Sequence, residues 1–340
     1  MRSTPAPTAT APRRAVRAWV GPLGGVGILA FLLWRLGTGP FVEGLRMVDG
    51  RALAAAVGIG VLTTLCCAWR WSLVAAGLGV RLPVRTAVAA CYQSVFLNAT
   101  LPGGVLGDVD RAVRHGRDVG DVGRGVRAVV WERTAGQVVQ LAMAAIVLLA
   151  FPSPVRAYVP AVAAVALAGG LAVLALSRLL PRRGHPRWAR TRWAQALRTA
   201  RADIRGGLLA RHNRLRIVLA SAVVVSGHLA TFLIAARAAG SMAPLSRLVP
   251  LTLLALLAMG LPANVGGFGP REGVAAWAFG AAGLTASQGV STAVVYGALV
   301  LVSSLPGAAV LVGRRIRVPA ALGRPIRVPA AVSAEGALSG

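Results

Sequence analysis

The chain reads LPGGVLGDVDR at residues 101–111 and LPANVGGFGPR at residues 261–271. We call these stretches the first break and the second break, because proline and glycine interrupt helices. In each break the arginine follows the proline by nine residues, and both breaks adjoin apolar segments. At membrane depth an interrupted helix is tolerated only where it is buried in protein or lines a polar cavity. A matched pair of breaks therefore predicts a membrane protein with a ligand site between them.

The composition supports a polytopic membrane protein. Of the 340 residues, 56% are hydrophobic and 14% are charged, and the mean hydropathy is +0.67, which excludes an ordinary soluble domain. All 37 basic residues are arginine, and the formal net charge is +27. We interpret this charge as compositional bias together with the positive-inside rule, and not as a sign of nucleic-acid binding. Three cysteines without C-x-x-C spacing indicate neither a disulfide framework nor a metal site.

The hydropathy pattern predicts eight apolar segments of about 20 residues, the length that crosses a bilayer. Residues 178–216 hold twelve arginines against one acid, so we expect this loop to be cytoplasmic. The predicted segments are 18–36, 52–69 extending toward 78, 86–106, 126–151, 157–179, 217–239, 247–270 and 288–312.

Arginine placement divides these segments into crossings and re-entrant segments. Both flanks of 86–106 are basic, which favours a segment that dips into the membrane and returns. Three segments lie between the basic loop and the basic tail, which are both expected to be cytoplasmic. The chain must cross the membrane an even number of times between them, so one segment is expected to be re-entrant. We assign this role to 247–270 because it contains the second break. We expect an all-α polytopic membrane protein with about six full spans plus two broken or re-entrant helical segments in an inverted repeat. Three full crossings in each half remain the alternative.

The expected domain organisation has three parts. Residues 1–17 form a disordered basic arm. Residues 18–313 form the transmembrane domain, which includes the arginine-rich loop 181–216, and residues 314–340 form a disordered basic tail. We expect both termini to be cytoplasmic and the protein to lie in the inner or plasma membrane of the cell.

Polar and flexible residues gather at both breaks. A helix N-terminus attracts an anion, and an arginine beside it binds phosphate through paired hydrogen bonds. We therefore predict a phosphate site formed by Arg111, Arg271 and the backbone of the glycines. The alternative is that the glycines only let helices pack closely. The candidate residues are Asn98, Pro102, Gly103, Gly104, Gly107, Asp108 and Arg111, then Pro262, Asn264, Gly266, Gly267, Gly269, Arg271 and Glu272.

Glu132 and Arg133 lie at the start of an apolar run that continues to Phe151. An ionisable residue within or near a span is costly in lipid and is therefore a functional candidate. Neighbouring residues point about 100° apart on a helix, so the two side chains need separate partners. The alternative is an interface position from which both side chains reach the headgroups.

Asp108 and Asp110 spell a D-x-D motif, which in sugar-nucleotide transferases holds a divalent metal against a diphosphate. It supports an alternative hypothesis, a polyprenyl-linked glycosyltransferase. No nucleotide-binding pattern accompanies the motif, and the four histidines lack metal-binding spacing. We expect neither a cofactor nor a bound metal.

Three ordered motifs carry a family resemblance. They are Asn98 to Asp108 with Arg111, then Glu132-Arg133-Thr-Ala-Gly136, then Leu261-Pro262 through Gly266-Gly267-Phe-Gly-Pro-Arg271-Glu272-Gly273. Over about residues 20–313 the chain resembles the lysylphosphatidylglycerol synthase transmembrane-region family, the flippase-like domain. One departure is Leu106, where the family usually has a second glycine before Gly107-Asp108.

The resemblance implies a multi-span inner-membrane protein that translocates or handles a phosphate-bearing lipid. The bifunctional synthases carry a soluble aminoacyl-transfer domain after the membrane part. The printed sequence reaches residue 340 without one, so we expect the membrane part only and no synthesis of the lysyl lipid.

Our leading hypothesis is a lipid flippase or transporter that binds an anionic phospholipid or a polyprenyl-phosphate lipid between the breaks. Arg111 and Arg271 would hold the phosphate. Asp108, Glu132 and Glu272 would either orient the arginines or respond to a cationic headgroup. A further alternative is a membrane partner that docks a separate lipid-modifying enzyme through loop 181–216. Assembly as a homo-oligomer also remains open.

Overall fold

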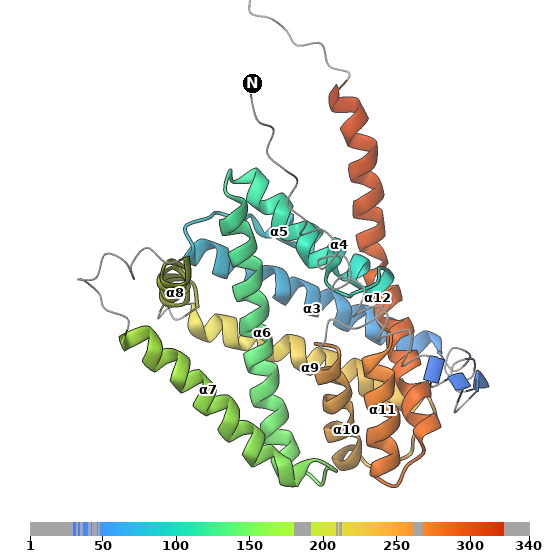
Figure 1. Ribbon diagram of the computed structural model, residues 1–340. Coiled ribbons are helices and arrows are strands. Elements are labelled where there is room, and N and C mark those ends of the chain that lie inside the picture. The colour runs from blue at the N-terminus through green and yellow to red at the C-terminus, as the bar shows by residue number, and fades with distance from the viewer. Residues whose placement is uncertain are drawn as a thin grey trace, which may run out of the picture.

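The structure is a computed structural model, and every regular element that it describes is a helix (Figure 1). It describes residues 30–31, 33–34, 37–39, 42, 46, 48–179, 192–208, 210, 213–260 and 268–322. The first half contains α3 Gly50–Gly77, α4 Val84–Thr100, α5 Leu106–Asp118 and α6 Val122–Ala150. The connecting region contains η1 Arg156–Tyr158, α7 Val159–Leu179, α8 Arg192–Asp203 and η2 Ile204–Leu208. The second half contains α9 Arg214–Ala238, α10 Leu245–Ala258, α11 Pro270–Ala281 and α12 Ala286–Leu322.

Four of the described helices are long and apolar enough to cross a membrane, namely α3, α6, α9 and α12 as far as Gly313. The shortest of them, α9, has 25 residues, or about 38 Å at 1.5 Å per residue, against a hydrocarbon core of about 30 Å. The expected all-α polytopic membrane fold is thus confirmed, and these four helices are candidates for four of its six expected spans. The expected span 157–179 corresponds to α7, and the expected span 18–36 lies mostly outside the described residues.

Each break separates two short helices that pack against each other. At the first break α4 ends at Thr100, α5 begins at Leu106, and Gly103 and Gly104 adopt positive φ angles of 94° and 61° in the turn between them. Glycine takes such angles without a steric penalty. With 17 and 13 residues, α4 and α5 reach only about 26 Å and 20 Å. Neither arm of the first hairpin, α4 with α5, is therefore long enough to cross the hydrocarbon core alone.

The second hairpin consists of α10 and α11, which also contact each other. They have 14 and 12 residues, or about 21 Å and 18 Å, and residues 261–267 between them lie outside the described part of the chain. The returning arms differ from our expectation. The expected segments 86–106 and 247–270 each cover only the first arm of a hairpin and the break. The second arms, α5 and α11, are formed by the residues that follow these segments.

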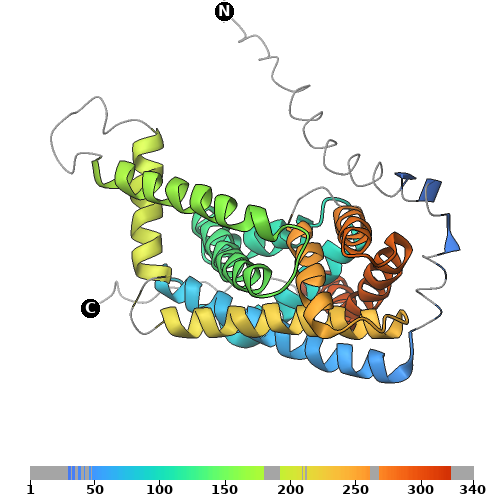
Figure 2. The ribbon, with the colours of Figure 1, turned by 90° about the horizontal axis from the view of Figure 1, so that it is seen from below.

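The two halves run in opposite senses. Along α3 and α9, Arg70 contacts Ser221 and Thr63 lies beside Gly227, and the end of α3 at Gly77 lies against Gly207 of η2, just before α9. The numbering therefore rises on one helix as it falls on the other, and Figures 1 and 2 both show the pair side by side and antiparallel. In Figure 1, α6 runs downward from α5, whereas α12 runs upward and projects beyond the other helices.

The hairpins interlock with the opposite half. A Cβ at Gly307 on α12 would overlap the backbone carbonyl of Tyr92 on α4, so these two helices touch backbone to backbone. In the other half, Leu254 and Leu257 near the end of α10 pack with Ala144 and Leu148 of α6. Each hairpin thus packs against the last helix of the other half, the first hairpin against α12 and the second against α6.

The arginine-rich loop is partly folded onto the bundle. The carboxylate of Asp203, the last residue of α8, forms an ion pair with Arg127 Nε at 2.9 Å and accepts a hydrogen bond from Trp131 Nε1 at 3.1 Å. Gly207 in η2 packs against the end of α3 at Gly77. At the other end of the chain, α12 continues to Leu322, past Gly313 where we expected the membrane domain to end.

Close packing inside the first hairpin gives a stability prediction. A Cβ at Gly107 would overlap the backbone carbonyl of Ser94 on α4. We expect Gly107→Ala to lower the free energy of unfolding by about 1–3 kcal/mol, because the two arms must move apart. Thermal melting in detergent measures this loss. The control is Gly280→Ala on α11, where a Cβ meets nothing within 4 Å; equal melting temperatures for the two variants would contradict the packing argument.

Candidate functional site

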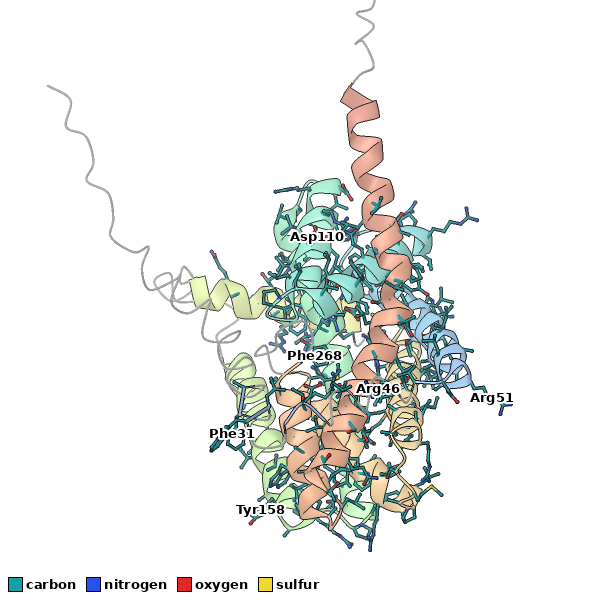
Figure 3. The ribbon with its side chains drawn as sticks, turned by 90° about the vertical axis from the view of Figure 1, so that its right-hand side faces the viewer. Phe31, Arg46, Arg51, Asp110, Tyr158 and Phe268 are labelled. Atoms are coloured by element: carbon teal, nitrogen blue, oxygen red, sulfur yellow. The ribbon has the colours of Figure 1, made fainter. Side chains whose placement is uncertain are left out.

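A cavity of about 270 Å³ lies where the two hairpins meet α3, α6, α9 and α12. The first hairpin contributes Asn98 and Ala99 at the end of α4 and Gly104 of the first break, and the second contributes Gly260 after α10 and Phe268 of the second break. Figure 3 shows Phe268 at mid-height of the bundle, between Asp110 toward one end and Tyr158 at the other. The two breaks therefore border one internal space. Its polar lining residues are Arg70, Asn98, Arg133, Gln137, Gln140, His228, Arg271 and Tyr296.

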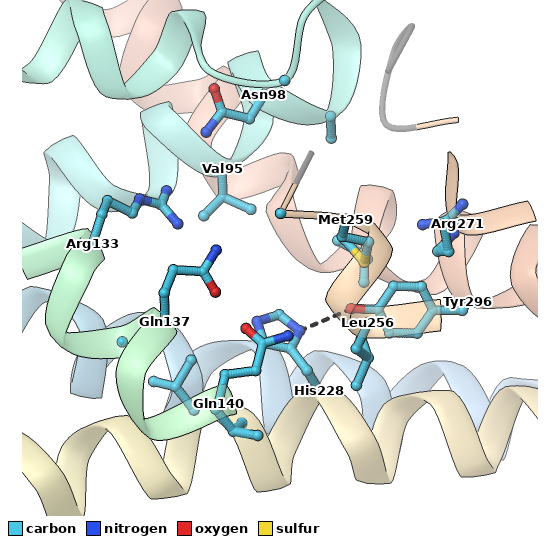
Figure 4. A pocket seen from close by; sticks show the side chains of 18 of the residues that line it. Val95, Asn98, Arg133, Gln137, Gln140, His228, Leu256, Met259, Arg271 and Tyr296 are labelled. Carbon is cyan, nitrogen blue, oxygen red and sulfur yellow. Dashed lines mark hydrogen bonds between the residues drawn. The ribbon is translucent and has the colours of Figure 1, made fainter. Parts of the chain in front are cut away.

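Figure 4 shows the polar side chains distributed around the cavity. Arg133 lies on one side and Arg271 on the other, with Gln137, His228 and Tyr296 between them. The hydroxyl of Tyr296 and Nδ1 of His228 are 2.9 Å apart and hydrogen-bonded. His228 lies inside a span, and its ring joins α9 to α12 as a hydrogen-bonding partner.

Glu132 is the centre of the buried charge network. Its side chain is fully buried on α6, and its two carboxylate oxygens accept hydrogen bonds from Arg70 Nε at 2.9 Å and from Arg111 Nη2 at 2.6 Å. The alternative of an interface position for Glu132 is therefore wrong. The carboxylate holds α3 and α5 to α6.

Asp108 extends this network. Its carboxylate accepts hydrogen bonds from Arg111 Nε at 3.0 Å and from Arg133 Nη2 at 2.7 Å. The order of partners is Arg70, Glu132, Arg111, Asp108, Arg133, in which each carboxylate is shared by two arginines. We call this row of five side chains the charge ladder. Glu132 binds Arg70 and Arg111, whereas Arg133 binds Asp108. The two adjacent residues therefore have separate partners, as expected.

Hydrogen bonds from neighbouring helices fix the ladder in place. On α4, Ser94 Oγ donates to Asp108 at 2.8 Å and Asn98 Nδ2 donates at 3.2 Å, while Asn98 Oδ1 accepts from the Gly107 N–H at 2.8 Å. On α9, Ser221 accepts from Arg70 Nη1 at 3.0 Å. Hydrogen bonds between α4 and α5 therefore hold the two arms of the first hairpin together, and α9 holds Arg70 at the end of the ladder.

Arg271 has a separate support. It donates to Glu272 Oε1, with Nε at 2.9 Å, and Oε2 of the same carboxylate accepts from the Gly269 N–H at 2.7 Å and caps α11. Its guanidinium carbon lies 5.3 Å from the ring centre of Phe268 and 5.1 Å from that of Tyr296, within cation–π range. Arg271 is therefore fixed beside the cavity, with its carboxylate partner behind it.

The predicted site residues divide into three groups. Asn98, Gly104, Arg133 and Arg271 line the cavity. Pro262, Asn264, Gly266 and Gly267 lie outside the described residues. The remaining members, which support the lining residues or form the turn, are Pro102, Gly103, Gly107, Asp108, Arg111, Glu132, Gly269 and Glu272.

Arg111 departs most from the expectation that it faces a ligand. Its side chain is buried, its guanidinium lies 4.7 Å over the ring of Trp71, and both Glu132 and Asp108 bind it. It is not among the residues that line the cavity. Arg111 connects the two carboxylates of the ladder, and Arg70 and Arg133 take the place beside the cavity.

Sequence reasoning missed several lining residues. Arg70 lies in an apolar helix, and an arginine within a span is by itself a signal of a functional position. Gln137 and Gln140 follow the predicted residue Arg133 at spacings of four and three on α6, which places all three on one face of a helix. His228 is an ionisable residue within a span and carries the same kind of signal as Arg70. Phe268 and Tyr296 carry no comparable signal.

The D-x-D motif does not form a metal site in the described structure. Asp108 is bound by Arg111 and Arg133, and Asp110 is bound by Arg114 at 2.8 Å and by Gln93 at 3.2 Å. Each carboxylate is therefore neutralised by arginine, and the pair does not converge. Within the described ranges no three His, Cys, Asp or Glu side chains gather as metal ligands.

Comparison with known proteins gives one match. The model of a family described as "Lysylphosphatidylglycerol synthase TM region" matches residues 18–307. No curated protein matches, and no solved structure matches. The chain belongs to this family, a multi-pass membrane domain of the flippase-like type that is associated with membrane lipids.

Proposed function

We propose that the protein binds the anionic, phosphate-bearing headgroup of a membrane lipid in the cavity and moves that lipid between leaflets. One observation carries the proposal: Arg70, Arg133 and Arg271 line the cavity, and no aspartate or glutamate is among the described residues that line it. The three carboxylates of the region, on Asp108, Glu132 and Glu272, bind the arginines from behind. The space enclosed by the hairpins is therefore positive.

The residue types suit a phosphate. Guanidinium groups bind phosphate oxygens through paired hydrogen bonds, and such bonds are stronger where water is scarce. Asn98, Gln137 and Gln140 add neutral hydrogen-bonding groups to the same lining. The apolar remainder, which includes Val95, Leu256 and Val300, is compatible with the upper part of an acyl chain.

The hairpins supply a route through the membrane. Interrupted helices that meet near the middle of the membrane are typical of transporters, because the irregular backbone needs a polar cavity. We further propose that loop 178–216, with its twelve arginines, is cytoplasmic. The first hairpin then enters from the cytoplasm and the second from the opposite side, with both termini cytoplasmic.

Lipid movement is tested in vesicles that contain the purified protein and a fluorescent phosphatidylglycerol, with chemical quenching of the outer leaflet. We expect the protein to speed exchange between leaflets. Ala99→Trp, which fills the cavity from α4, should slow the exchange by at least about tenfold. The matched control is Val138→Trp on α6, whose side chain is 60% exposed on the outside of the bundle. Exchange that is equally fast with and without protein would reject the proposal.

A further inference from the structure

The charge ladder is unbalanced by one charge. It contains three arginines and two carboxylates, so its formal charge is +1. The charges of Arg271 and Glu272 cancel each other. His228, which is hydrogen-bonded to Tyr296, is counted as neutral. The stretch 261–267, which joins the second hairpin, contains no ionisable residue in its sequence. The charged groups described around the cavity therefore carry one positive charge in excess.

The excess lies at the ends of the ladder. Arg111, in the middle, is bound by a carboxylate on each side, whereas Arg70 binds Glu132 and Arg133 binds Asp108. Both end arginines line the cavity. The side chain of Arg133 is 45% exposed, compared with 4% for Arg70 and 1% for Arg111. The unbalanced charge therefore faces the empty space and not the packed interior.

Charge balance has a large effect at such a site. An unpaired charge away from water is unfavourable by several kcal/mol, and an opposite charge with good geometry removes that penalty. One negative charge bound between Arg70 and Arg133 would close the row into a ring in which positive and negative groups alternate. A second negative charge would leave the site negative, and a headgroup with no net charge would leave it positive.

We propose that the site selects a lipid headgroup with a single negative charge, a phosphodiester monoanion, held between Arg70 and Arg133. This inference rests on the proposed function and names the charge class of its substrate. Zwitterionic lipids are disfavoured because they leave the excess charge unbalanced. Lipids with a terminal phosphomonoester, which carries about −1.5 to −2 near neutral pH, are disfavoured because they overbalance it.

The test compares three lipids in the vesicle assay: phosphatidylglycerol as the monoanion, phosphatidylethanolamine as the zwitterion and phosphatidic acid as the phosphomonoester. The wild-type protein should move phosphatidylglycerol at least about tenfold faster than either of the others. Wild-type protein that moves all three lipids equally fast would overturn the charge selection and leave the proposed lipid movement intact. Wild-type protein that moves none of them would overturn both.

Charge-altering variants make the test specific. Arg133→Gln makes the formal charge of the ladder zero, so the preference should shift by about tenfold toward phosphatidylethanolamine. Asp108→Asn makes it +2, so the preference should shift by a similar factor toward phosphatidic acid. The double variant returns the charge to +1 and should regain the preference for phosphatidylglycerol. A merely structural role for these residues predicts additive damage, and a folded double variant without the regained preference would overturn the inference.

Two further measurements complete the design. The melting temperature of each variant in detergent identifies those that are folded, and lipid ratios are compared only among these. Soluble glycerophosphoglycerol, the phosphodiester monoanion without acyl chains, is added as a competitor to distinguish a lipid headgroup from a free anion. Competition at concentrations comparable to those of the lipid would show that the site takes a free anion and would overturn the lipid assignment; absence of competition supports it.

Discussion

Replacing Glu132 by alanine should destabilise the protein by about 3–5 kcal/mol, the range measured when one partner of a buried ion pair is removed. Glu132 is fully buried and binds both Arg70 and Arg111. Its loss leaves two buried guanidinium groups with a single carboxylate, Asp108, in their network. We expect a large fall in the melting temperature in detergent and little folded protein in the membrane.

The matched control for this prediction is Asp110→Asn. Asp110 binds Arg114 on the surface of the same hairpin, with a side chain that is 37% exposed. Exposed ion pairs contribute about 0–1 kcal/mol, so this variant should melt close to the wild type. If Glu132→Ala also melted close to the wild type, Glu132 would not be the structural centre of the ladder.

The second large effect is expected on lipid movement and comes from Arg271→Ala. Arg271 lines the cavity opposite Arg133 (Figure 4), and hydrogen bonds to a charged group contribute about 1.5–3 kcal/mol each. Loss of its contact with a phosphate should slow transfer by about 10- to 100-fold. Vesicle exchange of phosphatidylglycerol measures the effect. Because Arg271 and Glu272 form a buried ion pair, this variant should also lose stability, so its transfer rate is measured on protein that a melting curve in detergent shows to be folded.

Two variants separate the causes of this loss. Arg271→Lys keeps the charge without the planar fork, and it should restore only part of the rate. Arg237→Ala removes an arginine that donates to the Ser241 carbonyl at the end of α9 and does not line the cavity, so it should leave the rate unchanged. An unchanged transfer rate in Arg271→Ala would show that the second break is not part of the binding site.

The sequence predicted the main features of the fold because they depend on local chemistry. Proline and glycine at Pro102, Gly103 and Gly104 interrupt a helix whatever surrounds them, and the structure has a turn at this place. The returning arm of the first hairpin was missed because α5 is polar and basic in sequence, although Arg111 and Ala112 are buried against its neighbours. Its burial depends on partners in α3 and α6, which no local pattern reveals.

The site was predictable only in part for the same reason. Equal spacing in the two breaks suggested equal roles for Arg111 and Arg271, but their environments differ. In the first half, Glu132 and the ring of Trp71 hold the arginine away from the cavity. In the second half, the neighbouring residue Glu272 binds the arginine, and Gly297 leaves the space that it occupies; a Cβ there would lie 2.6 Å from Arg271 Nη2.

The interlocking of the hairpins restricts how the cavity can open. A rocking motion of one half against the other, as rigid bodies, would pull α4 from α12 and α10 from α6 at the same time. Backbone contact at Gly307 and the leucine packing on α6 would both be lost. Alternating access by this protein is therefore expected to come from small displacements of single hairpin arms, with the four long helices as a fixed frame.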